Sequence, residues 1–169
     1  MINLIKDFKA YSKGKLFFSA FINLGFYITL NYRLGHFFYK IYLYPISKIF
    51  WLINRILFSV DINMKAKIAG GFVIHHGIGI VIGSRVIIKG PLNIYQQVTL
   101  GGNHGKSKIF NGKKISMPYI NNNVSIYPGA KVLGPVIIGE NAKIGVNAIV
   151  TKDVPSNGMI INTNKLLDA

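Results

Sequence analysis

The fold is decided by residues 61–100, DINMKAKIAGGFVIHHGIGIVIGSRVIIKGPLNIYQQVTL. An aliphatic residue recurs every six positions here, and the same period resumes after a break. A period of six fits neither an α-helix nor an alternating strand, but it is the signature of a parallel β-helix, in which one aliphatic side chain per face points inward. The in-phase positions are Ile62, Ile68, Ile74, Ile80, Val86, Leu92, Val98, Ile120, Ile126, Val132, Ile138, Ile144 and Val150.

The break divides the repeat and predicts a loop. The interval from Val98 to Ile120 is much longer than the single hexad that should separate them, so residues 103–118, NHGKSKIFNGKKISMP, should leave the β-helix as a protruding loop. The chain then has three parts: an N-terminal helical segment (1–60), a β-helix (61–155) and a C-terminal tail (156–169). Loops on a rigid scaffold are common places for binding sites, and this one carries lysines and no acid.

The charge balance points to an anionic partner. Lysine and arginine number 20 and aspartate and glutamate 5, giving a net charge of +15. No zinc-finger spacing or RNA-binding motif accompanies this charge, so we expect lipid or phosphorylated ligands rather than nucleic acid. The chain has no cysteine, which excludes disulfides, thiolate metal sites and a cysteine nucleophile.

Three stretches resemble the hexapeptide acyltransferases: DINMKAKIAGGFVIHHGIGIVIG, VTLGGNHGKSK and PGAKVLGPVIIGENAKIGVNAIVTKDVP, over about residues 61–155. The resemblance is to the serine-acetyltransferase-like branch and, within it, to acetyltransferases of capsule, colanic acid and related surface polysaccharides, with YRLGHF at 32–37 as a further cue. It implies a left-handed β-helix, a homotrimer, and acetyl-CoA bound in a groove between adjacent β-helices.

The resemblance also implies a catalytic histidine. His76, the second of the pair His75–His76, matches the general base, and Asp61 matches the aspartate that partners it. The chemistry is sound, because a neutral imidazole can take the proton of a hydroxyl group as its oxygen attacks a thioester. A carboxylate on the far ring nitrogen would fix the tautomer, within one subunit or between two.

The remaining candidates follow from matched positions. His75, His104 and Met117 are predicted to contact the acceptor. Gly102 and Pro128 should line the pantetheine path, and Lys143 and Lys152 should meet the phosphates of CoA. No bound metal is expected.

The predicted acceptor rests on departures from the serine enzymes. His75 stands where those enzymes carry an aspartate, and Ser116 and Met117 stand where they carry an Arg-His pair before a proline. We therefore expect an O-acetyltransferase acting on a sugar hydroxyl of a bacterial surface polysaccharide or its precursor, free or lipid-linked, with serine O-acetyltransferase as the alternative. A zinc site formed by His75, His76 and His104, and a purely structural β-helix, are the other hypotheses.

The first sixty residues suggest a membrane surface. Residues 16–32 are uncharged but fall at the short edge for a transmembrane helix, and a secretory signal is the other interpretation. Arg33, Lys40, Lys48 and Arg55 are spaced 7, 8 and 7 apart, which predicts a basic stripe on helices divided near Pro45. Such a stripe among aromatic residues favours contact with an anionic membrane, so we expect a cytoplasmic protein peripheral to the inner face of the cell membrane.

Overall fold

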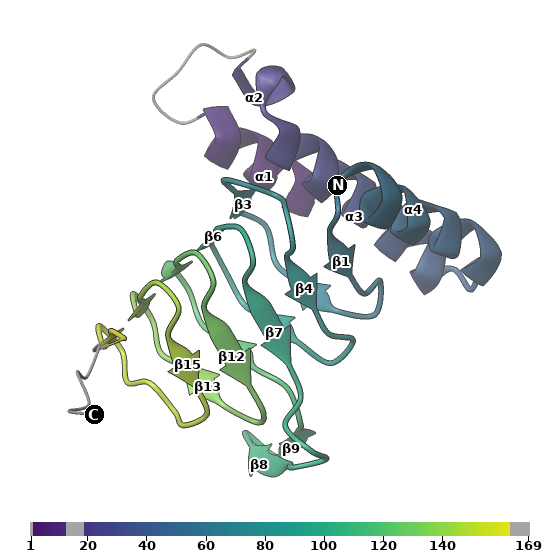
Figure 1. Cartoon of the computed structure of the whole chain (residues 1–169). Coiled ribbons are helices and arrows are strands. Elements are labelled where there is room, and N and C mark those ends of the chain that lie inside the picture. Colours follow the sequence, from purple (N-terminus) through teal and green to yellow (C-terminus); the bar gives the residue numbers. More distant parts are fainter. Residues whose placement is uncertain (1, 13–18, 163–169) are drawn as a thin grey trace, which may run out of the picture.

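The computed structural model describes residues 2–12 and 19–162. A triangular parallel β-helix runs from Asp61 towards the C-terminus, and helices lie across its N-terminal end (Figure 1). The helices are α1 (Ile2–Ser12), α2 (Ser19–Ile22), α3 (Leu24–Lys40) and α4 (Tyr44–Leu57). The predicted mainly β class, with a helical N-terminal segment, is confirmed.

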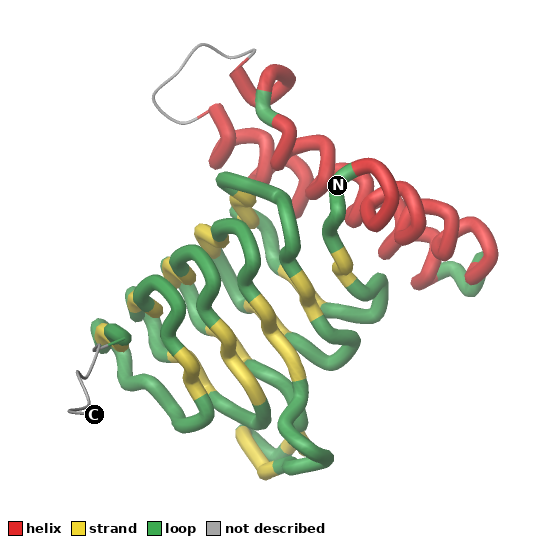
Figure 2. Tube along the Cα trace, viewed as in Figure 1, coloured by secondary structure: helices red, strands yellow, loops and turns green. Residues whose placement is uncertain are grey.

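Short strands stack into three parallel sheets, one on each face of the triangle (Figure 2). The first face has the order β1 (Asp61–Ile62), β4 (Val81–Ile82), β7 (Thr99–Gly101), β12 (Lys131–Leu133) and β15 (Ile149–Val150). The second face contains β2 (Lys67–Ile68), β5 (Ile87–Ile88), β10 (Tyr119–Ile120) and β13 (Ile137–Ile138). The third contains β3 (Phe72–Ile74), β6 (Leu92–Ile94), β11 (Val124–Ile126), β14 (Lys143–Ile144) and β16 (Met159–Ile160). β16 thus extends the pairing beyond residue 155, while residues 163–169 of the predicted tail lie outside the described part of the chain.

All thirteen in-phase aliphatic residues are buried in one continuous core. Their phase nevertheless contains a slip that the sequence period concealed. Ile82 pairs with Leu100, which is three hexads further along the chain. Three hexads after Ile62 is Ile80, but Ile62 pairs with Ile82 instead. Two extra residues therefore enter the first coil between Ile74 and Ile82, at the corner that holds the two histidines. The prediction of an unbroken run from Ile62 to Val98 is wrong at this corner, and two fewer residues belong to the later loop.

That later insertion contains an antiparallel hairpin of β8 (Lys108–Phe110) and β9 (Lys113–Ile115). The hairpin projects from the bottom of the molecule in Figure 1. Lys108 Nζ lies 2.6 Å from both carboxylate oxygens of Asp153, which follows β15. Partial desolvation raises the pKa of Asp153, but hydrogen bonds from Lys108 and the Ile137 amide, with the charge of Lys108, together outweigh it and lower the pKa. The hairpin is thus held against the last coils.

The helices are anchored to the β-helix by a buried ion pair. Arg33 Nε donates to Asp7 Oδ2 at 2.8 Å, joining α3 to α1, and the Arg33 guanidinium also donates to the carbonyls of Ile68 and Ala69. Asp7 Oδ1 accepts the amides of Gly71 and Phe72 at 2.8 and 3.0 Å. The first coil therefore receives α1 and α3 through polar contacts as well as apolar packing.

These contacts correct the prediction of a basic membrane-binding stripe. Pro45 does begin a second helix, as expected, but the side chain of Arg33 is only 9% exposed and Arg55 binds Asp61. The four cations therefore do not share one solvated face. Within residues 2–12 and 19–162, no helix is long and apolar enough to cross a membrane. Residues 16–18 of the uncharged stretch lie outside the described chain.

Candidate active site

The two-residue insertion widens the corner between β3 and β4, and His75 and His76 begin this corner. A Cβ at Gly77 would lie 2.4 Å from Ile28 Cδ1 of α3, so glycine allows the corner to pass beneath the helix. Gly79 has a φ of +73°, a conformation that L side chains rarely adopt. The chain thus builds an unusual, exposed turn directly under its helical cap.

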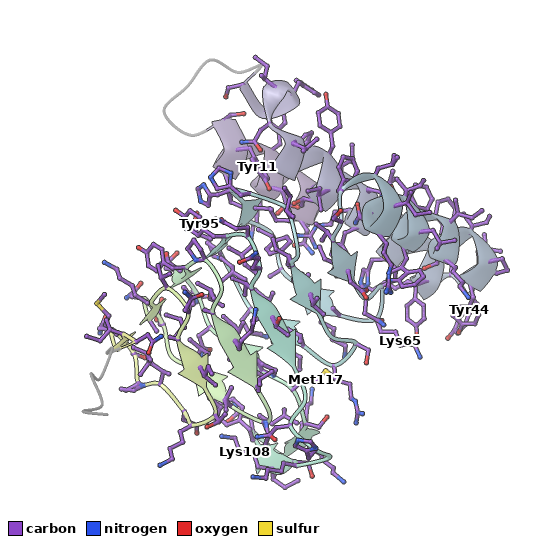
Figure 3. The ribbon with its side chains drawn as sticks, in the orientation of Figure 1. Tyr11, Tyr44, Lys65, Tyr95, Lys108 and Met117 are labelled. Atoms are coloured by element: carbon purple, nitrogen blue, oxygen red, sulfur yellow. The ribbon has the colours of Figure 1, made fainter. Side chains whose placement is uncertain are left out.

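His75 belongs to a ladder of rings on successive coils. Its ring stacks on Tyr95 with centroids 4.4 Å apart and planes at 11°, and Tyr95 stacks on Tyr127 at 5.5 Å. His75 Nε2 also lies 3.0 Å from Asn93 Oδ1. Figure 3 places Tyr95 at this edge of the β-helix. His75 is therefore held by its neighbours, although its edge remains exposed.

His76 is the freer of the two histidines. Its side chain is exposed, and its ring lies 6.4 Å from Tyr95 at a tilt of 46°. Among the described residues it has no hydrogen-bond partner, so both ring nitrogens are available to other molecules. This is the arrangement that a general base needs, since the base must reach the acceptor proton directly.

Asp61 does not contact His76 in this chain. Its Oδ1 accepts a hydrogen bond from Trp51 Nε1 at 2.8 Å, and its Oδ2 accepts one from Arg55 Nη1 at 3.0 Å. Both donors belong to α4, and the Arg55 guanidinium also lies 5.1 Å over the Trp51 ring. Asp61 thus ties α4 to the first coil, and its pairing with His76 stays a prediction.

The other two predicted acceptor residues lie apart from the histidine corner. Met117 is half-buried, its Sδ accepts the Arg85 amide at 3.3 Å, and a Cβ at Gly83 would lie 2.7 Å from this sulfur. His104 is exposed in the loop with a φ of 43°. Within one chain, neither is brought together with His76, so their proposed contact with the acceptor stays a prediction.

The predicted CoA residues lie in three places on the chain. Gly102 is exposed at the start of the loop, beside a groove of 510 Å³ that Lys152 lines together with Asn103 and Lys106. Pro128 lies between β11 and β12, the corner column that also contains the histidines, and its carbonyl accepts the Asn147 amide at 2.9 Å. Lys143 is exposed on the third face and is not part of the groove.

Sequence reasoning missed several residues around these sites. Tyr95 and Tyr127 lie on opposite sides of the inserted loop, and their neighbours Ile94 and Ile126 pair directly, but the undetected slip hid this alignment with His75. Trp51 and Lys106 gave no periodic signal, because one lies on a helix and the other in the inserted loop.

Comparison with known proteins identifies the family. The model of the bacterial transferase hexapeptide (six repeats) family matches residues 117–152. A serine acetyltransferase of Helicobacter pylori is 38% identical over 139 residues, which cover 82% of this chain and 78% of that protein. The chain belongs to the serine acetyltransferase family.

Further relatives extend this family match along the chain. The serine acetyltransferase of Buchnera aphidicola is 38% identical over 163 residues, covering 90% of this chain and 59% of that protein, so the chain spans somewhat over half of this relative. The crystal structure of the Neisseria gonorrhoeae serine acetyltransferase in complex with serine has a TM-score of 0.83 and 26% identity, covering 96% of this chain and 66% of that one. The predicted class, an acyltransferase with acetyl-CoA as co-substrate, is confirmed at the level of the family.

The prediction of a polysaccharide O-acetyltransferase is wrong. The relatives are serine acetyltransferases, and the match to the Neisseria gonorrhoeae structure covers 96% of this chain. The residues that suggested a sugar have structural roles here: His75 stacks on Tyr95 and contacts Asn93, and Met117 packs on Gly83. These packing contacts account for both residues without a sugar, and their predicted contact with the acceptor stays a prediction.

The structure also bears on the zinc hypothesis. Among residues 2–12 and 19–162, no three histidine, cysteine, aspartate or glutamate side chains come together as a potential metal site. His104 lies in the loop, away from the corner of His75 and His76.

Proposed function

We propose that this chain transfers the acetyl group of acetyl-CoA to the hydroxyl group of serine. One observation carries the proposal: in a serine acetyltransferase family member, the widened corner presents an exposed His76 with no hydrogen-bond partner in the described residues. A base so placed can reach a small hydroxyl substrate without first breaking an internal contact.

The proposed reaction is a general-base acyl transfer. Neutral His76 takes the proton of the serine hydroxyl as the oxygen attacks the thioester carbon. The tetrahedral intermediate then collapses, the carbon–sulfur bond breaks, and the imidazolium returns the proton to the departing sulfur. The products are O-acetylserine and CoA. Asp61 would stabilise the imidazolium only if assembly or closure brings it to His76.

The donor is proposed to bind at the loop groove. Lys106 and Lys152 both line this groove, so two cations are available for the phosphates of CoA. Lys108 also lines it, but its ammonium is already paired with Asp153. Gly102, at the edge of the groove, leaves room for the pantetheine chain. Lys143, on another face, would meet CoA only if a neighbouring subunit brings a second β-helix to it.

The chain is proposed to act as a homotrimer. Each donor groove would then lie between adjacent β-helices, and the histidine corner of one subunit would face the loop of the next. Exposed apolar side chains on and beside the first face support this, since large apolar patches commonly mark protein interfaces. They are Ile78, Val81, Val146 and Ile149.

We place the protein in the cytoplasm, where acetyl-CoA is available, in contact with the inner face of the membrane. Exposed apolar residues of α3 and α4, including Phe37, Ile49 and Ile56, support that contact, with Lys40 and Lys48 beside them. Co-sedimentation with phosphatidylglycerol vesicles but not phosphatidylcholine vesicles is the expected result. Equal recovery in both supernatants would contradict membrane contact.

The test of the activity is thiol release by the purified protein with acetyl-CoA and L-serine, with O-acetylserine identified by mass spectrometry. We expect turnover that depends on serine and saturates with it. Reactions without acceptor and with L-alanine, which lacks the hydroxyl group, are the controls. Binding of acetyl-CoA without serine-dependent turnover would overturn the proposal.

A further inference from the structure

A pocket of 440 Å³ lies between the helices and the first coil, away from the donor groove. Its walls are the side chains of Tyr39, Tyr44 and Trp51, and Met64 also contributes to its lining. Pockets of roughly 300–1,000 Å³ with apolar and aromatic walls are typical of small-molecule sites. In Figure 3, Lys65 projects from the first coil below α4, and Tyr44 lies towards the far end of the helix pair.

The walls favour a planar ring. Tyr39 and Tyr44 already contact each other, with ring centroids 5.3 Å apart and planes at 47°. An aromatic ligand can add stacked or edge contacts to such side chains, beyond the gain from burial. Tyr39 and Trp51 are each half-buried, so part of each ring remains open to a ligand.

The rim favours a negative charge. Lys48 and Lys65 are both exposed at the pocket, and Lys65 Nζ lies 5.9 Å over the Tyr39 ring. No acidic residue is among those that line the pocket in the described part of the chain. The net charge of +15 strengthens the attraction for anions over the whole surface. A cationic ligand would be repelled by both lysines.

We infer that this pocket is a binding site for a small aromatic anion: a planar ring that lies among Tyr39, Tyr44 and Trp51 and carries a phosphate or carboxylate held by Lys48 and Lys65. The site is separate from the histidine corner and from the loop groove. Binding in it does not depend on the proposed function.

The pocket is coupled to a predicted catalytic residue. Trp51, one of its walls, donates its indole N–H to Asp61 at 2.8 Å. A bound ring that moves or immobilises Trp51 therefore affects the Asp61 carboxylate, which links α4 to the first coil. This second step rests on the proposed function, and it predicts that the ligand changes the rate of acetyl transfer without occupying the donor groove.

The chain has one tryptophan, so fluorescence reports this pocket directly. The experiment titrates the purified protein with adenosine 5′-monophosphate and with 4-hydroxybenzoate, one phosphate and one carboxylate. We expect saturable quenching of Trp51 by at least one probe. Adenosine and ribose 5-phosphate, which carry the ring and the phosphate separately, should bind at least ten-fold more weakly than adenosine 5′-monophosphate if that nucleotide binds.

Variants locate the binding. Lys48→Ala combined with Lys65→Ala should raise the Kd at least ten-fold, whereas Lys114→Ala, an exposed hairpin lysine outside the pocket, should leave it unchanged. Failure of both probes to quench at 10 mM would overturn the inference. So would quenching that survives the double substitution, because the probe would then occupy another site.

Fluorescence separates this inference from the proposed activity. A protein that is inactive with serine can still bind the probe, and an active protein can fail to bind it. With a bound probe, a change in serine turnover at saturating acetyl-CoA would support the coupling through Trp51. Unchanged turnover would overturn the coupling and leave the binding site standing.

Discussion

At the scale of single residues, two adjacent histidines have different surroundings. His75 is stacked on Tyr95 and contacts Asn93, whereas His76 is exposed with no hydrogen-bond partner among the described residues. The difference follows from the backbone, because His75 continues the register of β3 beside Tyr95 and His76 enters the widened corner. Sequence alone presents them as an equivalent pair.

This difference predicts a selective loss of activity. Replacement His76→Ala should lower kcat for serine acetylation by about 10²–10⁴-fold, the usual contribution of a general base, with acetyl-CoA binding retained. His75→Ala, the matched control at the neighbouring position, should reduce kcat by less than ten-fold because it removes a packing contact. Thiol release under saturating substrates measures both. Equal losses in the two variants would contradict the assignment of His76.

A third histidine links stability to pH. The Nδ1 atom of His36, on α3, lies 2.7 Å from the Met64 carbonyl oxygen, and the ring stacks on Tyr32. Burial lowers the pKa of His36 despite the hydrogen bond to Met64. The charges of Lys40, Arg33 and Lys67 lower it further. Below about pH 6.5 the unfolded chain therefore binds more protons than the folded one at this site. The stabilising contribution is complete above that pH and is lost as pH falls through the folded pKa.

The expected result is a decline in the free energy of unfolding between pH 7 and pH 5. In His36→Gln the decline should be shallower, whereas His104→Gln, in the exposed loop, should retain the wild-type slope. Urea unfolding at a series of pH values measures this. Parallel curves for wild type and His36→Gln would show that this histidine does not contribute to the dependence.

At the scale of elements, the repeat was predictable and its interruptions only partly so. Buried aliphatics every six residues specified the presence of the coils from the sequence, but not their exact register. The slip between Ile74 and Ile82 escaped because Ile80, two positions earlier, is also buried and continues the apparent period. Two extra residues in a corner change the register but leave the hydrophobic pattern intact.

The helical cap was predictable as helices but not in its packing. Pro45 marks the start of α4 as expected from its missing amide, but periodicity cannot show which charges become buried. Asp7 and Arg33 belong to different helices, and their pairing depends on how α1 and α3 meet over Gly71. The same limit applies to Asp61, whose donors Trp51 and Arg55 come from a neighbouring element.

The buried ion pair predicts a large cost for one substitution in α1. Asp7→Asn should lower the free energy of unfolding by about 3–5 kcal/mol, because it leaves the mostly buried Arg33 guanidinium without its counter-charge. Asp153→Asn, in the exposed pair with Lys108, should cost about 1 kcal/mol or less. Urea denaturation at pH 7 compares the two.

A double-mutant cycle with Arg33→Met isolates the pair. If Asp7 acts mainly through Arg33, the combined variant should be more stable than the sum of the two single losses implies. Additive losses would mean instead that Asp7 acts chiefly through the amides of Gly71 and Phe72.

At the scale of the whole molecule, the faces of the β-helix differ in how many cations they carry. The second face and the nearby hairpin carry Lys67, Arg85, Lys89, Lys113 and Lys114 around two pockets. The first face has exposed aliphatics at Val81 and Ile149, and Lys131, which pairs with Ile149, donates to the Gln97 carbonyl. Mutual repulsion disfavours packing two strongly basic faces together. If copies of this chain associate, this repulsion favours the first face over the second as the surface of contact.

The exposed aliphatics of the first face predict how the assembly can be broken. Ile149 is 70% exposed on β15 and Val81 is 39% exposed on β4, so the double substitution Val81→Lys and Ile149→Lys adds two charges to the proposed trimer interface without entering the core. Sedimentation should change from trimer to monomer, and circular dichroism should remain that of wild type. Met159→Lys, at a residue 62% exposed on β16 of the third face, is the control and should stay trimeric.

Because the proposed donor groove lies between adjacent β-helices, the monomeric variant should also lose serine acetylation although His76 and its corner are unchanged. A variant that stays trimeric would place the interface elsewhere, and a fully active monomer would show that one chain contains the whole site.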